Sequence, residues 1–254
     1  MNHILNIAIR IIREIGVILL KNYEYINIKY SYENNEVIVN NWNKRVEKYT
    51  INLIKKYYPK HSCTTKHYFI HNNNINWIIN FEKNINIIKK LPYYTISIAI
   101  QINKRTEIAI IYELINNELF TAIRGQGAQL NNKRLRVNNN KTLSNSIITT
   151  NLITKNIKDI NKKLSFIKKL MIAKIDLRCY GTNILDLAYL AAGRIDGILL
   201  YKINNINYYI SGILLAIESG NLIFDHDGNN NYSQSRNLLI GNPKISNLIL
   251  EIIK

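Results

Sequence analysis

Hydrophobic residues recur every three or four positions near the start of the chain, a spacing that is typical of amphipathic helices. Residues 4–23 place their apolar side chains on one face, and residues 43–58 repeat the pattern until Pro59 ends it. The side chains expected to face inward from the second segment are Val46, Tyr49, Ile51, Leu53, Ile54 and Tyr57. The first part of the chain therefore predicts two long helices.

After Pro59 the spacing changes to that of strands. Four short runs rich in β-branched and aromatic side chains follow, with asparagine-containing turns between them. These runs cover residues 76–80, 94–102, 106–113 and 117–123. Closely spaced strands of this kind predict an antiparallel meander. Gly125 and Gly127 then predict a β-turn in the segment Arg124–Gly127, before a further strand near residues 134–137.

From residue 141 onward, strand-like and helix-like segments alternate, which favours layered α/β packing. The expected elements are strand 146–150, helix 156–170, strand 173–179, helix 183–193, strand 195–200, helix 208–219, strands 221–225 and 237–240, and helix 244–253. No repeat or long polar linker divides the chain. We therefore expect one 254-residue unit, made of an α+β subdomain over residues 1–140 and an α/β subdomain over residues 141–254.

The composition excludes some classes of protein. No apolar run reaches 18 residues, so we expect no membrane span. The N-terminal segment is interrupted by Arg10, Arg13 and Glu14, unlike a signal peptide. Cys63 and Cys179 lack CxxC spacing and predict two buried free thiols in a reducing cytoplasm.

The formal net charge of +17 has two interpretations. It can be an electrostatic footprint for RNA or another polyanion. It can also follow from the base composition of an AT-rich genome, because residues with AT-rich codons, lysine among them, dominate the chain. The sequence has 17 Tyr and 5 Phe. The lysines are scattered along the chain, which favours base composition. Examples that share no segment are Lys21, Lys55, Lys104, Lys162 and Lys254.

Several specific stretches resemble the inositol monophosphatase family. They are LPYYTISIA from Leu91, NELFTAIRGQGAQLNNKRLR from Asn117, YGTNILDLAYLAAGRIDG from Tyr180 and GNPK from Gly241. The resemblance runs nearly end to end, and the chain is identified as a member of the family, closest to one of its bacterial branches. It implies an αβαβα layered sandwich and an Mg²⁺-dependent phosphatase that acts on inositol monophosphate or similar sugar phosphates.

The bacterial branch implies a second role that is unrelated to catalysis. Its members bind the elongation factor NusA and join the RNA polymerase antitermination complex on ribosomal RNA operons, where they support transcription and rRNA maturation. The resemblance also implies a homodimer. Our leading hypothesis is this non-catalytic role; a weakened phosphatase and direct RNA binding are the alternatives.

The family's metal-ligand positions carry unusual residues here. No aspartate occurs before Asp159. The family's Glu-Glu pair corresponds to Lys66 and His67, and we interpret His67 as a solvent-exposed loop histidine rather than a transition-metal ligand. The family motif Asp-Pro-(Ile/Leu)-Asp-Gly-Thr is shortened by one residue. It corresponds to Asn80, Glu82, Lys83 and, for the water-positioning Thr, Asn84.

Three further family positions have also lost their carboxylate. By resemblance, Asn43 stands at an Asp, Tyr208 at the metal-binding Asp of a Trp-Asp motif, and Leu200 at a Glu that contacts the sugar hydroxyls. Glu82 is therefore the one metal carboxylate that can remain. Because Mg²⁺ prefers hard, anionic oxygen ligands, the sequence predicts weak or absent Mg²⁺ binding.

The substrate side of the family pocket is better matched, at Gly181, Thr182 and Asn183. A helix starts there, so the segment can hold an anion, but ordinary capping by Thr182 is the preferred interpretation. Asp186 and Asp196 match family acids outside the metal set, and we expect Asp186 to be a polar-network residue. The acidic segment Asp225–Gly228 is interpreted as a turn rather than a ligand cluster.

Overall fold

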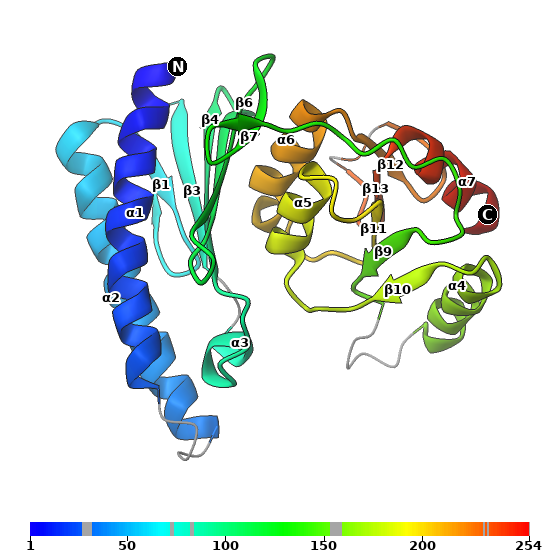
Figure 1. Cartoon of the computed structure of the whole chain (residues 1–254). Helices are drawn as coiled ribbons and strands as arrows, with labels where there is room; N and C mark the ends of the chain where they lie inside the picture. The colour runs from blue at the N-terminus through cyan, green and yellow to red at the C-terminus, as the bar shows by residue number, and fades with distance from the viewer. Residues whose placement is uncertain are drawn as a thin grey trace. The chain divides into compact units, whose positions relative to one another are not determined.

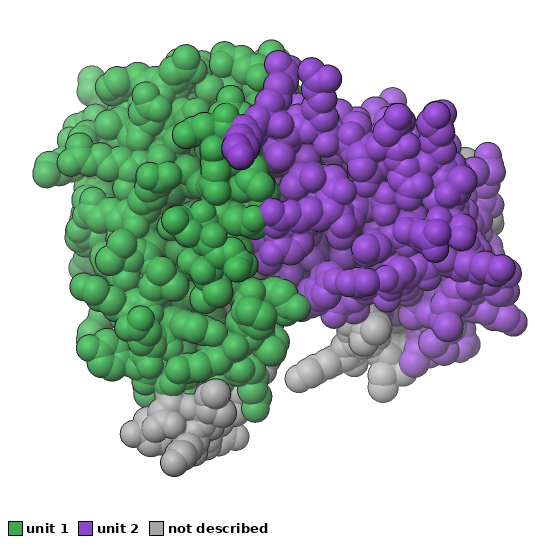
Figure 2. Space-filling model, viewed as in Figure 1, with its two compact units in different colours: residues 1–132 green, residues 133–254 purple. Residues whose placement is uncertain are grey.

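The computed structural model describes residues 1–26, 32–71, 74–81, 84–152, 159–230, 232 and 234–253, without the side chains of residues 32, 33, 84 and 85 (Figure 1). It is a mixed α/β structure with two sheets, as predicted. The chain forms two compact units, residues 1–132 and 133–254, which Figure 2 shows in different colours. The division into subdomains at residue 140 stays a prediction.

Unit 1 begins with two long helices, α1 (Asn2–Tyr25) and α2 (Tyr32–Tyr57), which lie side by side (Figure 1). The helical spacing of the sequence is confirmed in α1, which also contacts the central strands of the sheet. Its buried residues are Ala8, Ile11, Ile12, Ile15, Gly16 and Leu19. Neither these helices nor any other in the described ranges is apolar enough over its length to cross a membrane.

The sheet of unit 1 is built around the predicted meander. In spatial order its strands are β2 (Phe69–Ile70), β1 (Ser62–Thr64), β3 (Ile75–Phe81), β4 (Thr95–Ile102), β5 (Arg105–Glu113), β6 (Glu118–Ile123), β7 (Gly127–Leu130) and β8 (Lys133–Arg134). Each consecutive pair from β3 to β7 is antiparallel, which confirms the meander. Strand β1 lies parallel to β3, and the short helix α3 (Asn84–Ile88) connects β3 to β4.

Unit 2 has a five-stranded sheet with helices packed on it. The strand order is β10 (Asp176–Arg178), β9 (Ile147–Thr150), β11 (Gly197–Leu200), β13 (Leu238–Gly241) and β12 (Leu222–Asp225). The helices are α4 (Ile160–Ile172), α5 (Asn183–Ala191), α6 (Ile210–Ser219) and α7 (Pro243–Ile253), with a 3₁₀ turn η1 (Ile206–Tyr208) before α6. The predicted alternation of strands and helices is therefore confirmed.

Two hydrophobic clusters explain why strands β11 and β13 of unit 2 are almost wholly apolar. In β11, Leu199 packs into a cluster with residues of α4 and α7, whereas Ile198 and Leu200 pack into a cluster with residues of α5 and α6. Successive strand side chains point to opposite faces. Since both faces are covered, both sets of positions must be hydrophobic.

Several sequence predictions were wrong in detail. Helix α2 starts at Tyr32, not at residue 43, and Tyr49 and Tyr57 are 40% and 36% exposed rather than inward-facing. They lie off the buried stripe of the helix, which runs through Val39, Asn43, Val46, Glu47, Thr50 and Ile54. The strand expected near residues 134–137 is limited to the two residues of β8.

The two cysteines have different environments. Cys63 is buried as predicted, and burial raises the pKa of its thiol to about 11, so the thiol stays protonated at neutral pH. Cys179 is exposed, contrary to prediction, because it follows the edge strand β10. Its Sγ donates a hydrogen bond to the carbonyl oxygen of Thr150 at 2.8 Å.

Gly212 allows helices α5 and α6 to pack closely. A Cβ atom at this position would lie 2.4 Å from Cβ of Leu187. We expect Gly212→Ala to lower the free energy of unfolding by about 1–3 kcal/mol, as overpacking does, in urea denaturation followed by circular dichroism. The same substitution should cost less in a Leu187→Gly background, which removes the Cβ atom that it would contact. Equal stability of Gly212→Ala and the wild type would contradict the close contact.

Candidate functional site

The residues that match family metal positions in unit 1 occupy three elements. Lys66 and His67 lie in the turn between β1 and β2, Lys66 being exposed. Asn80 is half-buried near the end of β3, and Asn43 is buried in α2. Glu82, with its neighbour Lys83, lies outside the described residues, as does the side chain of Asn84. Those assignments stay predictions.

A buried carboxylate that the sequence analysis did not identify fixes the β1–β2 turn. Glu47 is 1% exposed and lies one helical turn after Asn43 in α2. One of its oxygens accepts two hydrogen bonds, from the hydroxyl of Thr65 at 2.5 Å and from the backbone N–H of His67 at 3.1 Å. Its other oxygen lies 2.9 Å from Nδ1 of His67. Glu47 therefore joins the second helix to the turn that carries Lys66.

The interpretation of His67 as a solvated loop residue was wrong. Its side chain is 22% exposed, and its ring is held by Glu47. The turn is closed further by Thr65, whose backbone N–H donates to the carbonyl oxygen of Tyr68 at 2.8 Å and whose hydroxyl accepts from the N–H of Tyr68 at 3.0 Å. His67 thus has a structural partner and sits in a well-defined turn.

The described side chains at these positions of unit 1 do not suit Mg²⁺, which takes hard and mostly anionic oxygen ligands. Lys66 offers an ammonium group, and Asn80 and Asn43 offer neutral amides. Both oxygens of Glu47 are already engaged by Thr65 and His67. Within the described ranges, no cluster of three or more His, Cys, Asp or Glu side chains is arranged to hold a metal ion.

The segment of unit 2 that matches the family's substrate pocket lies at the start of α5. Gly181 has a positive φ of 75°, and Thr182 occupies the N-cap position. The predicted capping hydrogen bond is not made; the Thr182 hydroxyl donates to Oδ1 of Asp186 at 3.3 Å. Asp186 is buried, as expected of a polar-network residue. Thr182 therefore supports the first turn of α5 through Asp186.

Asn183 links this helix start to the segment before α6. Its side-chain amide donates to the hydroxyl of Tyr209 at 3.1 Å. Burial raises the pKa of Tyr209, so this phenol stays protonated at neutral pH. Tyr208, at the family Asp position, is half-buried in η1 with its ring 5.3 Å from that of Tyr209. Aromatic side chains therefore occupy a segment where the family has an acid.

Two other predicted site positions are structural. Leu200 is fully buried in β11. Asp196 accepts hydrogen bonds from the amides of Asn138 at 2.8 Å and Asn140 at 3.0 Å, and from the backbone N–H of Ile147 at 2.8 Å. Asp196 thus joins three segments of unit 2.

Both turn predictions are confirmed. In the acidic segment, Asp225 accepts hydrogen bonds from the backbone N–H groups of Asp227 and Asn229 at 3.0 and 2.7 Å. In the Arg124–Gly127 segment, the N–H of Gln126 donates to the carbonyl oxygen of Ile123 at 2.9 Å.

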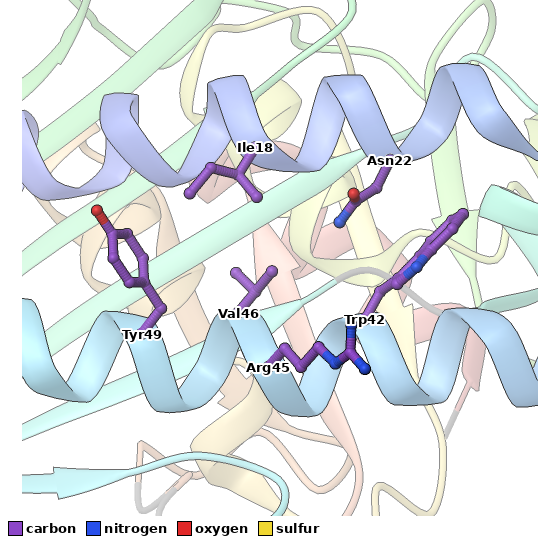
Figure 3. Close-up of a pocket in the computed structure, with 6 residues that line it drawn as sticks. All are labelled: Ile18, Asn22, Trp42, Arg45, Val46 and Tyr49. Atoms are coloured by element: carbon purple, nitrogen blue, oxygen red, sulfur yellow. The ribbon is translucent and has the colours of Figure 1, made fainter.

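A separate small cavity of about 260 Å³ lies between α1 and α2. It is lined by Ile18, Asn22, Trp42, Arg45, Val46 and Tyr49, and Figure 3 shows Ile18 and Val46 facing each other from the two helices. The Tyr49 hydroxyl donates to Glu14 at 2.5 Å, which ties the helices together at one end. The cavity is smaller than most ligand pockets and contains none of the family-site residues.

Comparison with protein families defines the class of protein. The model of the inositol monophosphatase family matches residues 1–254. The chain therefore belongs to the inositol monophosphatase family, as its motifs indicated.

Individual relatives identify the branch. The chain is 36% identical over 255 residues to "Nus factor SuhB" of Escherichia coli K12 and to that of Salmonella typhimurium LT2, covering 98% of this chain and 95% of each relative. It is 39% identical over 265 residues to "Nus factor SuhB" of Buchnera aphidicola subsp. Baizongia pistaciae, covering 100% of this chain and 97% of the relative. The resemblance to the bacterial SuhB branch is confirmed.

Solved structures confirm the fold class. The crystal structure of the extragenic suppressor protein suhB from Bartonella henselae superposes with a TM-score of 0.85 at 26% identity and 99% coverage of both chains. An inositol monophosphatase from Thermotoga maritima superposes with a TM-score of 0.83 at 22% identity, covering 100% of this chain and 97% of its own. The predicted inositol-monophosphatase type of fold is therefore correct.

Proposed function

We propose that the chain is a SuhB-like factor that supports ribosomal RNA transcription and maturation and does not act as a phosphatase. In this proposal it works in the cytoplasm as a homodimer and binds NusA within the RNA polymerase antitermination complex. The name Nus factor SuhB, which its relatives at 36–39% identity carry, supports the role. Catalysis is not needed for it, because the protein would act through its surface.

The observation that carries the proposal is the exchange of acidic ligand positions for Lys66, Asn80 and Tyr208. Two unit charges about 4 Å apart interact by about 4 kcal/mol at an effective dielectric constant of 20. Replacing attraction by repulsion at a single ligand position therefore costs Mg²⁺ several kcal/mol, and about 1.4 kcal/mol is tenfold in affinity. The hydrogen bonds that occupy Glu47 add to this argument, because no nearby described carboxylate can substitute.

The scaffold around the exchanged positions is kept. Buried hydrophobic clusters line both sheets, and Thr182 is buried at the start of α5. A loss of ligands combined with a maintained fold is what we expect of a protein whose remaining role depends on shape rather than on chemistry.

Capture of NusA tests the proposal. Immobilised full-length protein should retain NusA from the same organism at micromolar concentration, measured by pull-down and then by biolayer interferometry. The double variant Lys66→Glu/Asn80→Asp, which restores two carboxylates, should capture NusA equally well, because the metal site is not part of the interaction. Absence of binding at micromolar concentration would remove the basis of the proposal.

A weakened Mg²⁺-dependent phosphatase is the alternative. Its support is the presence of Glu82 at a family ligand position, where it could act with Asn80 and backbone carbonyl oxygens. Direct RNA binding through the positive surface is a third possibility. RNA affinity that barely changes between low and moderate salt would count against it, because phosphate contacts release counterions.

A further inference from the structure

Helix α4 carries a second apolar stripe that does not face the core of unit 2. Phe166 and Leu170 are buried, and Ile167 packs partly against the same cluster. Beside this face, Ile160, Leu164 and Met171 are 45%, 55% and 65% exposed, and Ile172 is 71% exposed.

The spacing of the stripe is that of a helix–helix contact. Ile160, Leu164, Ile167 and Met171 follow one another at intervals of four, three and four residues. This is the alternation of a and d positions in a heptad, which places side chains in a single seam for a facing helix. In Figure 1, α4 lies beside β10 within unit 2, and α7 also packs against α4.

Exposed apolar side chains are concentrated on this helix. Of the fourteen large hydrophobic residues that are exposed in the described part of the chain, four belong to the thirteen residues of α4. The others are spread over unrelated helices, strands and loops, as is normal for isolated surface residues. A stripe of which three of the four side chains are exposed is instead typical of an interaction surface.

The charges of α4 indicate the chemistry of the partner. The helix has four lysines, at 162, 163, 168 and 169, and no acidic residue. Lys162 and Lys163 lie over aromatic rings of this unit. Among the described residues, no carboxylate lies within 4.0 Å of the amino group of Lys168 or Lys169. Lys168 is exposed beside the stripe and can pair with an incoming anion.

We propose that the surface formed by Ile160, Leu164, Ile167, Met171 and Lys168 binds an acidic amphipathic helix of a partner protein. The partner would place apolar residues at heptad spacing against the stripe and a carboxylate opposite Lys168. A second copy of α4 is a poor occupant, because that helix has no acidic residue that could pair with Lys168. This inference goes beyond the proposed function and can be tested separately.

Designed peptides provide the test. Fluorescence anisotropy would measure binding of the full-length protein to an acidic peptide of about three heptads, with Leu and Ile at a and d and Glu at the flanking positions. A basic sibling carries Lys in place of Glu, and an acidic sibling carries Ser in place of Leu and Ile. The acidic apolar peptide should bind at least about tenfold more tightly than either sibling.

Variants of α4 locate the binding. Leu164→Ser/Met171→Ser should weaken binding of the acidic apolar peptide by about tenfold or more. Lys168→Glu should shift the preference toward the basic peptide. The matched control is Val17→Ser on α1, since Val17 is 56% exposed and Leu164 is 55% exposed. The control should bind like the wild type, and circular dichroism checks that every variant is folded.

Three outcomes would overturn the inference: equal affinity for all three peptides, an equal loss in Val17→Ser, or an oligomer that Leu164→Ser/Met171→Ser dissociates. The last would show that α4 is an interface between copies. If the wild-type protein does not capture NusA but still prefers the acidic apolar peptide, only the proposed function is wrong. NusA capture without any peptide preference would remove the α4 surface alone.

Discussion

Purified protein supplied with Mg²⁺ and inositol 1-phosphate should release phosphate no faster than a protein-free control. Loss of a catalytic metal removes several kcal/mol of transition-state stabilisation. The expected deficit relative to a metal-binding family member is therefore at least about a thousandfold. A malachite-green assay over a range of Mg²⁺ concentrations measures it.

Two variants show which residues determine the result. Glu82→Ala should leave the baseline unchanged, because a single carboxylate among the exchanged ligand positions does not hold the ion. Lys66→Glu/Asn80→Asp should raise affinity for Mg²⁺, since it replaces one cation and one neutral amide by anions. Phosphate release by the wild type that disappears in Glu82→Ala would overturn the non-catalytic account in favour of the weakened phosphatase.

Glu47→Ala should lower the free energy of unfolding by about 3 kcal/mol. The substitution leaves the hydroxyl of Thr65 and two N–H groups of His67 without their shared acceptor in a half-buried turn. Removing one partner from a buried hydrogen-bonded pair costs about 3–5 kcal/mol, and the partial exposure of His67 places this case at the lower end. Urea denaturation followed by circular dichroism measures the change.

Glu24→Ala is the matched control for Glu47, because Glu24 is an exposed glutamate on the neighbouring helix. Its substitution should change stability by less than about 0.5 kcal/mol. A similarly small effect of Glu47→Ala would mean that the carboxylate does not hold the β1–β2 turn, and the interpretation of Glu47 as a structural residue would be wrong.

The parts of the fold that the sequence predicted well depend on local pattern. Helix α1 repeats buried positions such as Ala8, Ile11 and Ile15 at helical spacing, and the meander strands are separated by short turns. In unit 2, alternating apolar strands and helices are enough to indicate layered packing. In each case residues close in the chain determine the structure, so spacing alone is informative.

The parts that were missed depend on contacts between distant residues. The first third of α2 is rich in asparagine and lay outside the predicted helix, yet Asn35 and Val39 are buried there. Tertiary packing outweighs the weak helix propensity of asparagine. The pairing of Glu47 with His67 joins residues 20 positions apart, and the only signal in the sequence was an acidic residue on the apolar face of a predicted helix.

The sequence predicted the candidate site only as a set of positions at which acidic residues of the family are exchanged for other residues. Family motifs place Lys66, Asn80 and Tyr208 at positions where acids are expected, but they do not show what replaces the missing interactions. The structure supplies part of that answer through Glu47, whose oxygens are used by the turn. The segment that contains Glu82 is one residue shorter than the family motif, so the motif does not predict its geometry.

The central claim is that the exchanged ligand positions of this chain do not retain Mg²⁺, and a crystal structure of the full chain grown in millimolar Mg²⁺ tests it most directly. Our account predicts clear density for Glu82 and Asn80 without an ordered divalent ion beside them. A magnesium ion refined there with oxygen ligands at about 2.1 Å would contradict it.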